Sequence, residues 1–162
     1  MMSPEEFLRA FPRICVGLNF EAFRSSSWPI TIQTASAAES FAKIYTAWYF
    51  APTRQTSIYN GVGYAESDAK PLRVSEASAA LLHLPSSRQR IVEKYEDEFK
   101  TLSGHISISV PAYAVGHGRH LLLDGNHRVV AVAHIGKPFE IKLVTIEGPI
   151  QRRYLLDLLH WE

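Results

Sequence analysis

The pattern of apolar and polar positions is clearest in the second half of the chain, where short apolar runs are separated by glycine and polar turns. Runs of this length, bounded by turn residues, favour buried strands. After the apolar run that ends at Leu123, the pattern changes at Asp124-Gly125. It continues as a segment rich in small apolar residues that ends at Gly136. A strand, a tight turn, a short helix and a further strand are therefore expected. The three strands are predicted near residues 106–110, 119–123 and 139–146.

Helical spacing and start signals predict helices along the rest of the chain. Ser3 and Glu6 form a capping-box pattern for a first helix, which Pro12 ends. A second helix is expected from Ser36 to about Phe50, with a broad aromatic face that either packs in the core or forms a partner-binding surface. That face carries Phe41, Ile44, Tyr45, Trp48 and Tyr49. Further helices are expected over 75–83, 88–102 and 151–161.

These elements predict an α/β (α+β) protein with a small mixed sheet and covering helices. Residues 1–71 are expected to form an N-terminal helical extension packed on the core, and residues 72–162 to carry the sheet. Within the extension, 51–71 are predicted as a loop, in which Tyr59-Asn60-Gly61 could close a hairpin. A length of 162 residues is typical of one compact domain.

Composition narrows the class of protein. The chain is 46% hydrophobic with a formal net charge of +1, which describes an ordinary globular protein and gives no basic footprint for nucleic acid. Nucleic acid is therefore not an expected partner. Cys15 is the single cysteine, which excludes an internal disulfide, and its apolar neighbours predict a buried thiol. No apolar run is long enough to span a membrane, and the start lacks a basic leader, so a cytoplasmic location is expected.

The turn Asp124-Gly125-Asn126-His127-Arg128 concentrates the candidate chemistry. A helix that begins here would point unpaired N–H groups and the positive end of its dipole at one small volume. Gly125 permits positive φ and close approach of a ligand to the backbone. The N–H groups of Asn126 and His127, with the planar fork of Arg128, would then hold a phosphate. The structural alternative is an ion pair from Arg128 to Asp124 or Glu140.

The same turn offers candidates for catalysis. Asp124 could act as a general base or hold a metal-bound water, or it could simply cap the helix. His127 could bind phosphate or transfer protons, or it could be a buried or helix-capping histidine. Asn126 could reach a substrate amide or cap the turn. The spacing of His117, His120 and His127 is not that of a standard zinc site, so no protein-bound metal is expected.

The motif and its flanks resemble the ParB N-terminal/sulfiredoxin-like superfamily over roughly residues 72–148. Members carry a Gly-x-His-Arg or Gly-x-Arg-Arg turn between a strand and a helix. The resemblance implies binding of ATP or another nucleotide through Gly125, Asn126, His127 and Arg128, with Mg²⁺ as a further expectation. It also implies hydrolysis or phosphotransfer, with Asp124 and His127 as the catalytic candidates.

Two departures from the family limit that inference. Asn126 stands where sulfiredoxins have their cysteine, so sulfiredoxin chemistry is not expected. Only residues 150–162 follow the matched region, too few for the helix-turn-helix DNA reader of ParB, so chromosome partitioning is not expected either.

Two classes of function remain open at this point. One is a protein that binds a nucleotide or a phosphorylated small molecule, with or without turnover. The other is a non-catalytic protein-binding module, such as a toxin-neutralising immunity protein. Burial of Phe41, Trp48 and Tyr49 beside a cleft at Asp124 and Arg128 would favour the first class. An occluded turn with an exposed aromatic or acidic surface, for example on 88–102, would favour the second.

Overall fold

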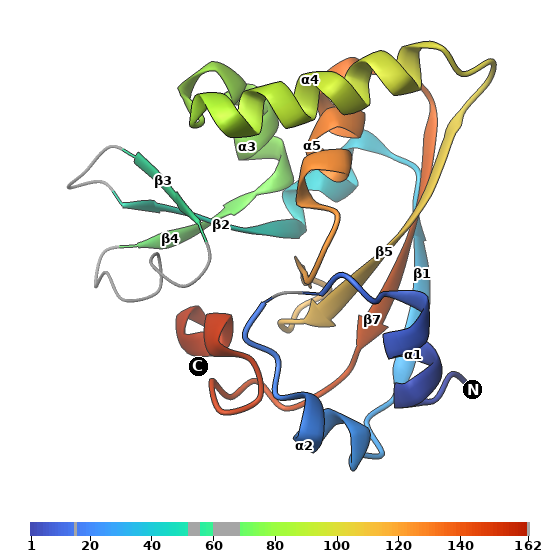
Figure 1. Ribbon diagram of the computed structural model, residues 1–162, viewed down its shortest axis with the longest axis vertical. Helices are drawn as coiled ribbons and strands as arrows, with labels where there is room; N and C mark the ends of the chain where they lie inside the picture. The colour runs from blue at the N-terminus through green and yellow to red at the C-terminus, as the bar shows by residue number, and fades with distance from the viewer. Residues whose placement is uncertain (15, 52–55, 60–68, 162) are drawn as a thin grey trace.

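In the computed structural model, residues 1–14, 16–51, 56–59 and 69–161 are described, and their strands form one mixed sheet (Figure 1). The strand order is β1-β7-β5-β6-β2-β3, and β4 pairs with β2. This confirms the predicted fold class, a small mixed sheet covered by helices. The strands are β1 (Ile30–Ala35), β2 (Ile44–Ala51), β3 (Thr56–Tyr59), β4 (Lys70–Arg73), β5 (Ile106–Ala114), β6 (His120–Leu122) and β7 (Phe139–Ile146).

The centre of the sheet positions the turn of interest. β5 and β7 run parallel from the pair Ile106–Phe139 to the pair Tyr113–Ile146, and β1 lies antiparallel on the outer side of β7. β6 pairs antiparallel with β5 and parallel with β2. The chain therefore leaves β6 in the middle of the sheet and crosses over through a helix to reach β7.

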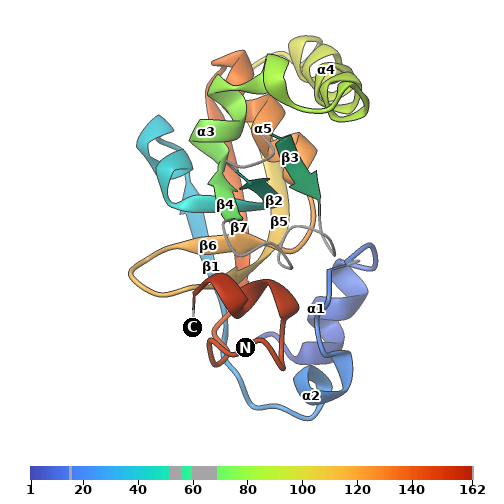
Figure 2. The same ribbon diagram turned by 90° about the vertical axis from the view of Figure 1, so that its left-hand side faces the viewer.

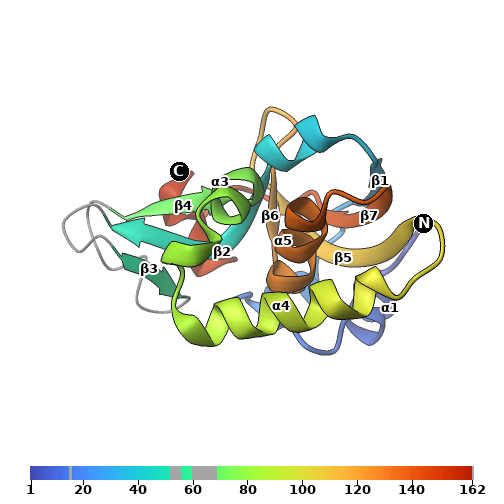
Figure 3. The ribbon, with the colours of Figure 1, turned by 90° about the horizontal axis from the view of Figure 1, so that it is seen from above.

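Helices cover both faces of the sheet. Figures 1 and 2 show α3, α4 and α5 gathered at one end, with α1, α2 and the C-terminal 3-10 helix at the other. From above, α4 lies alongside α5, against which it packs (Figure 3). The bounds are α1 (Pro4–Ala10), α2 (Phe20–Arg24), α3 (Val74–Ala79), α4 (Ser86–Lys100) and α5 (Asn126–Ile135), with 3-10 helices η1 (Ala38–Ala42), η3 (Leu81–His83) and η4 (Leu156–His160).

Two hydrophobic clusters hold these layers. One lies between the sheet and α3, α4 and α5, and it includes Trp48, Val110 and Val130. The other lies between the opposite face and α1, α2 and η4, and it includes Phe23 and Tyr113. The helix-to-sheet packing on each side follows from alternation along the strands, which sends successive side chains to opposite faces.

Several local predictions are confirmed. Ser3 and Glu6 form the capping box at the start of α1. α5 begins at the predicted turn and ends at Gly136, which has φ 72° and caps the helix in the left-handed conformation. The strands predicted near 106–110, 119–123 and 139–146 correspond to β5, β6 and β7.

The helix predicted from Ser36 to Phe50 is wrong. Its first part is the short 3-10 helix η1, and its second part is β2. β2 lies inside the sheet, and residues 44–49 are all buried. A strand buried on both faces is apolar at nearly every position, so its apolar side chains also occur at the spacing expected of a helix. Aromatic residues also favour strands, which agrees with the observed state.

Residues 1–71 carry α1 and α2, but they contain more than the helical extension that the sequence predicted. They also supply β1, β2, β3 and the start of β4, so strands from both halves of the chain build one sheet. The loop predicted over 51–71 likewise contains β3 and the start of β4. The proposed hairpin turn falls on Asn60 and Gly61, outside the described residues, as does Cys15.

The helix predicted over 151–161 is mostly wrong. Only the single 3-10 helix η4 forms there, after turns that bring Leu155 into a bridge with Leu18. In the part of the chain that the structure describes, no helix is both long and apolar enough to cross a membrane.

Candidate functional site

Gly125 forms the turn between β6 and α5. It has φ 79° and ψ 15°, a left-handed conformation, and it is the N-cap residue of α5. A Cβ atom placed on it would lie 2.7 Å from Cγ1 of Val110. Both the dihedral angle and the contact require glycine here.

The start of α5 presents backbone donors. The first hydrogen bond of the helix runs from the Val129 N–H to the Gly125 carbonyl at 3.0 Å. The N–H groups of residues 126–128 therefore precede the helical ladder, and the N-cap residue is a glycine, which has no side chain to cap them. Together with the helix dipole, these groups give the turn a partial positive charge.

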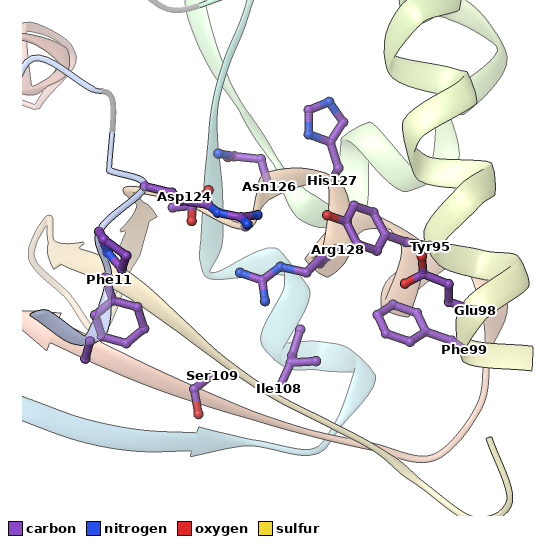
Figure 4. A pocket seen from close by; sticks show the side chains of 14 residues that line it. Phe11, Tyr95, Glu98, Phe99, Ile108, Ser109, Asp124, Asn126, His127 and Arg128 are labelled. Carbon is purple, nitrogen blue, oxygen red and sulfur yellow. The ribbon is translucent and has the colours of Figure 1, made fainter. Parts of the chain in front are cut away.

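A cleft with a volume of about 650 Å³ opens at this turn (Figure 4). Its walls come from the turn, from the C-terminal half of α4, from β5 and from the segment at the end of α1. In Figure 4, Phe11 lies on one side of the cleft and Tyr95 and Phe99 on the other, with Arg128 between them. The sequence did not predict Arg13 or the aromatic walls, because they lie far from the motif along the chain.

Arg128 lies in this cleft without the ion pair that was its structural alternative. Within the described residues, no ion pair joins Arg128 to Asp124 or to Glu140, and Glu140 is instead 3.9 Å from Lys142. One Nη of the guanidinium lies 3.1 Å from the Cβ position built on Gly125, so the group lies against the turn. The cation therefore faces the cleft beside the start of α5 (Figure 4).

Asp124 and Glu98 also line the cleft, and they lie on opposite sides of Arg128 in Figure 4. Asp124 lies two residues after the end of β6 and is half-buried, whereas Glu98 lies on α4 and is exposed. A carboxylate near phosphate-binding groups can accept a proton or share a divalent cation with the phosphate. Asp124 and Glu98 are thus the carboxylates of the described lining that could serve such roles.

The side chain of Asn126 makes a contact within the fold. Its carboxamide oxygen accepts a hydrogen bond from the backbone N–H of Ala47 in β2 at 2.8 Å, and the side chain is buried. The carboxamide oxygen is therefore engaged within the fold, and the backbone N–H is the group of Asn126 that we expect to contact an anion. The side chain instead fixes the start of α5 to the sheet.

The ring of His127 points away from the Arg128 guanidinium in Figure 4. It packs edge-on against Trp48, with ring centroids 5.0 Å apart. Burial, and then the charge of Arg88, lower the pKa of His127 to about 4, although Asp124 opposes the shift. Its Nε2 is buried and has no hydrogen-bond partner in the described part of the chain. His127 is therefore neutral at pH 7.

The histidines considered for zinc are not brought together. His120 is buried, with Nδ1 3.2 Å from Oγ1 of Thr145, whereas His117 is exposed in the turn before β6. Among the residues described, no three His, Cys, Asp or Glu side chains form a group that could hold a metal ion.

Comparison with protein-family models, with curated proteins and with solved structures gives no significant match to this chain. The resemblance to the ParB/sulfiredoxin-like superfamily therefore stays a prediction from the sequence.

Proposed function

We propose that the cleft at the start of α5 binds the phosphate group of a nucleotide. The observation that carries the proposal is the Arg128 guanidinium, which faces the cleft without an ion pair to Asp124 or Glu140 in the described structure. Beside it lie the backbone N–H groups that begin α5 and the left-handed Gly125. A cation with a planar fork and a helix N-terminus together form an anion site.

The other walls of the cleft fit the rest of such a ligand. Arg13 is exposed and supplies a second cation on the side of α1. Phe11 and Tyr95, which are half-buried, give the cleft flat apolar surfaces on which a base could stack, and Phe99 packs beside Tyr95. A bare phosphate would use the cations alone, whereas ATP or another nucleotide would use both kinds of wall.

Asp124 is the residue to which we assign any turnover. In hydrolysis, its carboxylate would take a proton from a water molecule. The water oxygen would bond to the terminal phosphorus as the bond from that phosphorus to the leaving phosphate oxygen breaks. In phosphotransfer, a substrate hydroxyl would replace the water. Mg²⁺, held by Asp124 and the phosphates, would neutralise charge on the ligand. His127 is less suited to be the base because its Nε2 is buried and its pKa is lowered to about 4.

The alternative, a non-catalytic protein-binding module, has less support. Its aromatic anchors were Phe41, Trp48 and Tyr49, and these side chains are only 5%, 0% and 0% exposed. They belong to the core and offer no surface to a partner. The cleft, by contrast, opens where the phosphate hypothesis needs it.

Calorimetry with ATP, ADP, CTP and GTP, each with and without Mg²⁺, tests the proposal. At least one nucleotide should bind, and Arg128→Ala should weaken that binding by on the order of 2–4 kcal/mol because a charge-assisted bond is lost. Arg90→Ala is the matched control, since Arg90 is an exposed arginine on α4 outside the cleft. No heat with any nucleotide at millimolar concentration would contradict the proposal. Recovery of a stoichiometric protein partner that tolerates Asp124→Ala and Arg128→Ala would favour the alternative.

A further inference from the structure

A second pocket lies elsewhere on the molecule, where β2, β4, the turn before β6 and η4 meet. It has a volume of about 490 Å³, and its lining shares no residue with the cleft at α5. Its walls are formed by Tyr45, Phe50, residues 70–73, Glu76, Arg119, His160 and Trp161. The pocket combines basic and aromatic side chains.

The charges of this lining do not cancel. Lys70, Arg73 and Arg119 are cationic, and Glu76 is the one carboxylate among the described lining residues. Glu76 is already engaged, because its Oε2 accepts a hydrogen bond from the backbone N–H of Arg73 at 2.7 Å. No ion pair within 4 Å involves any of these three cations in the described structure. The pocket therefore has a surplus of positive charge.

Both arginines are held by the protein before any ligand arrives. The Nε of Arg73 donates to the hydroxyl of Tyr45 at 3.1 Å, and its guanidinium lies 5.8 Å from the centre of that ring. Arg119 donates from Nε to the Gly116 carbonyl and from Nη2 to the Val115 carbonyl, both at 3.1 Å. Because these contacts leave other guanidinium N–H groups available, each arginine can still bind an anion at a reduced cost in side-chain entropy.

Aromatic rings form a large part of the remaining lining, beside Pro71 and Leu72. Trp161 packs edge-on against Tyr45, with ring centroids 5.5 Å apart, and is itself only half-buried. Phe50 is 37% exposed, although it is a large apolar side chain. A flat apolar group of a ligand could pack against these rings, next to the cations.

We propose that this pocket binds a small aromatic anion, a flat ring that carries a phosphate or a carboxylate. Lys70, Arg73 and Arg119 take the anionic group, and Trp161 and Phe50 contact the ring. With three cations against one carboxylate, a doubly charged phosphate fits better than a singly charged carboxylate. The proposal does not depend on nucleotide binding at α5.

The test follows the indole N–H signal of Trp161 by NMR in the full chain. The chain has three tryptophans, and Trp161→Phe identifies this signal by its loss. Phenyl phosphate is the main probe, with benzoate, inorganic phosphate and phenol as comparisons. All titrations use an Arg128→Gln background, which removes the main cation of the other cleft.

Phenyl phosphate should shift the Trp161 signal and bind at least about tenfold more tightly than inorganic phosphate or phenol, because neither of those two can use both kinds of wall. Arg73→Gln and Lys70→Gln should each weaken it by about tenfold, the effect of losing one charge-assisted contact. Lys94→Gln, an exposed lysine of α4 outside the pocket, should not. Tighter binding of benzoate would still support the pocket and identify a carboxylate as its ligand group.

Three results would overturn the proposal. One is no shift of the Trp161 signal with phenyl phosphate at millimolar concentration. Another is equal weakening by Lys94→Gln, which would indicate a general charge effect. The third is equal binding of phenyl phosphate and inorganic phosphate, which would show that the aromatic walls do not contribute. Loss of these effects would leave the calorimetry at α5 unchanged, so the two proposals fail separately.

Discussion

The carboxamide oxygen of Asn126 accepts a hydrogen bond from the backbone N–H of Ala47 at 2.8 Å. This bond joins the first residue of α5 to the middle of β2, and both residues are buried. It fixes the direction in which α5 presents its first N–H groups. The sequence predicted that Asn126 contacts a ligand. In the structure, its side chain instead holds the start of α5, which lines the cleft.

Asn126→Ala should lower the free energy of unfolding by about 1–3 kcal/mol, because the buried N–H of Ala47 loses its partner. Urea unfolding followed by fluorescence measures the change. Ser109→Ala is the control, since Ser109 is exposed and lines the same cleft. Equal stability of the two variants would show that the Asn126–Ala47 bond does not matter.

Gly125→Ala should destabilise the protein more than Gly104→Ala. Both glycines have positive φ, 79° and 91°, so both substitutions impose backbone strain of roughly 1–2 kcal/mol. Only Gly125 also faces Val110 at 2.7 Å, whereas nothing lies within 4 Å of a Cβ on Gly104. Gly125→Ala should also weaken phosphate binding, because Arg128 lies 3.1 Å from the new atom. Thermal unfolding and calorimetry of both variants measure these effects, and an equal loss in the two would contradict the packing argument.

Asp124→Asn should separate binding from turnover. If Asp124 is the base, the variant should keep nucleotide binding within a fewfold and lose phosphate release by about 10²–10⁴-fold, the usual range for a general base. Release of inorganic phosphate from bound nucleotide measures the rate. Asp97→Asn is the control, since Asp97 is an exposed carboxylate of α4 outside the described lining of the cleft. Unchanged release in Asp124→Asn would remove Asp124 from the mechanism.

His127 should make stability depend on pH in the acid range. Its pKa is lowered from 6.5 to about 4 in the folded state, chiefly by burial. Between these values the unfolded chain binds a proton that the folded protein does not, so stability falls as the pH drops from 6.5 toward 4. Burial lowers the pKa of His120 and His160 as well, and both act in the same direction.

His127→Gln, which cannot titrate, should flatten part of that dependence. Urea unfolding at pH values from 7 to 4 compares the two proteins, and an NMR titration of the His127 ring gives its pKa directly. A ring that titrates near its ordinary value of 6.5 would contradict the burial of its charged form.

Asp157 is a buried carboxylate of η4, outside the described lining of both pockets. It is 1% exposed and accepts a hydrogen bond from the hydroxyl of Tyr49. Burial raises the pKa of Asp157, although the bond from Tyr49 opposes the shift. The folded protein therefore holds this proton up to a higher pH than the unfolded chain does. Its stability falls as the pH rises from the ordinary carboxyl pKa to the raised one.

Asp157→Asn should therefore keep or increase stability at pH 7, since the amide oxygen still accepts the Tyr49 bond and carries no charge. Asp157→Ala should lower it by about 1–3 kcal/mol, because the hydroxyl loses its partner. Chemical unfolding at pH 5 and pH 8 compares the variants. A loss for Asp157→Asn equal to that of Asp157→Ala would show that the charge itself is needed.

Many of the turns and element boundaries around the cleft could be predicted from local sequence. The capping box of Ser3 and Glu6, the turn at Gly125 and the helix end at Gly136 each depend on dihedral angles and neighbours within a few residues. β7 was predicted over its observed residues for the same reason. The residues of the candidate turn were therefore placed correctly between a strand and a helix.

The sequence by itself determined where strands and helices change near the motif, because those signals act between adjacent residues. Only the tertiary structure decided that residues 44–51 form β2, since a strand buried on both faces has no alternation to distinguish it from a helix. It also decided that Asn126 binds Ala47, and that Arg13 and the aromatic side chains join the cleft. Those contacts join residues far apart in the chain. They stabilise the protein only once the sheet has brought these residues together.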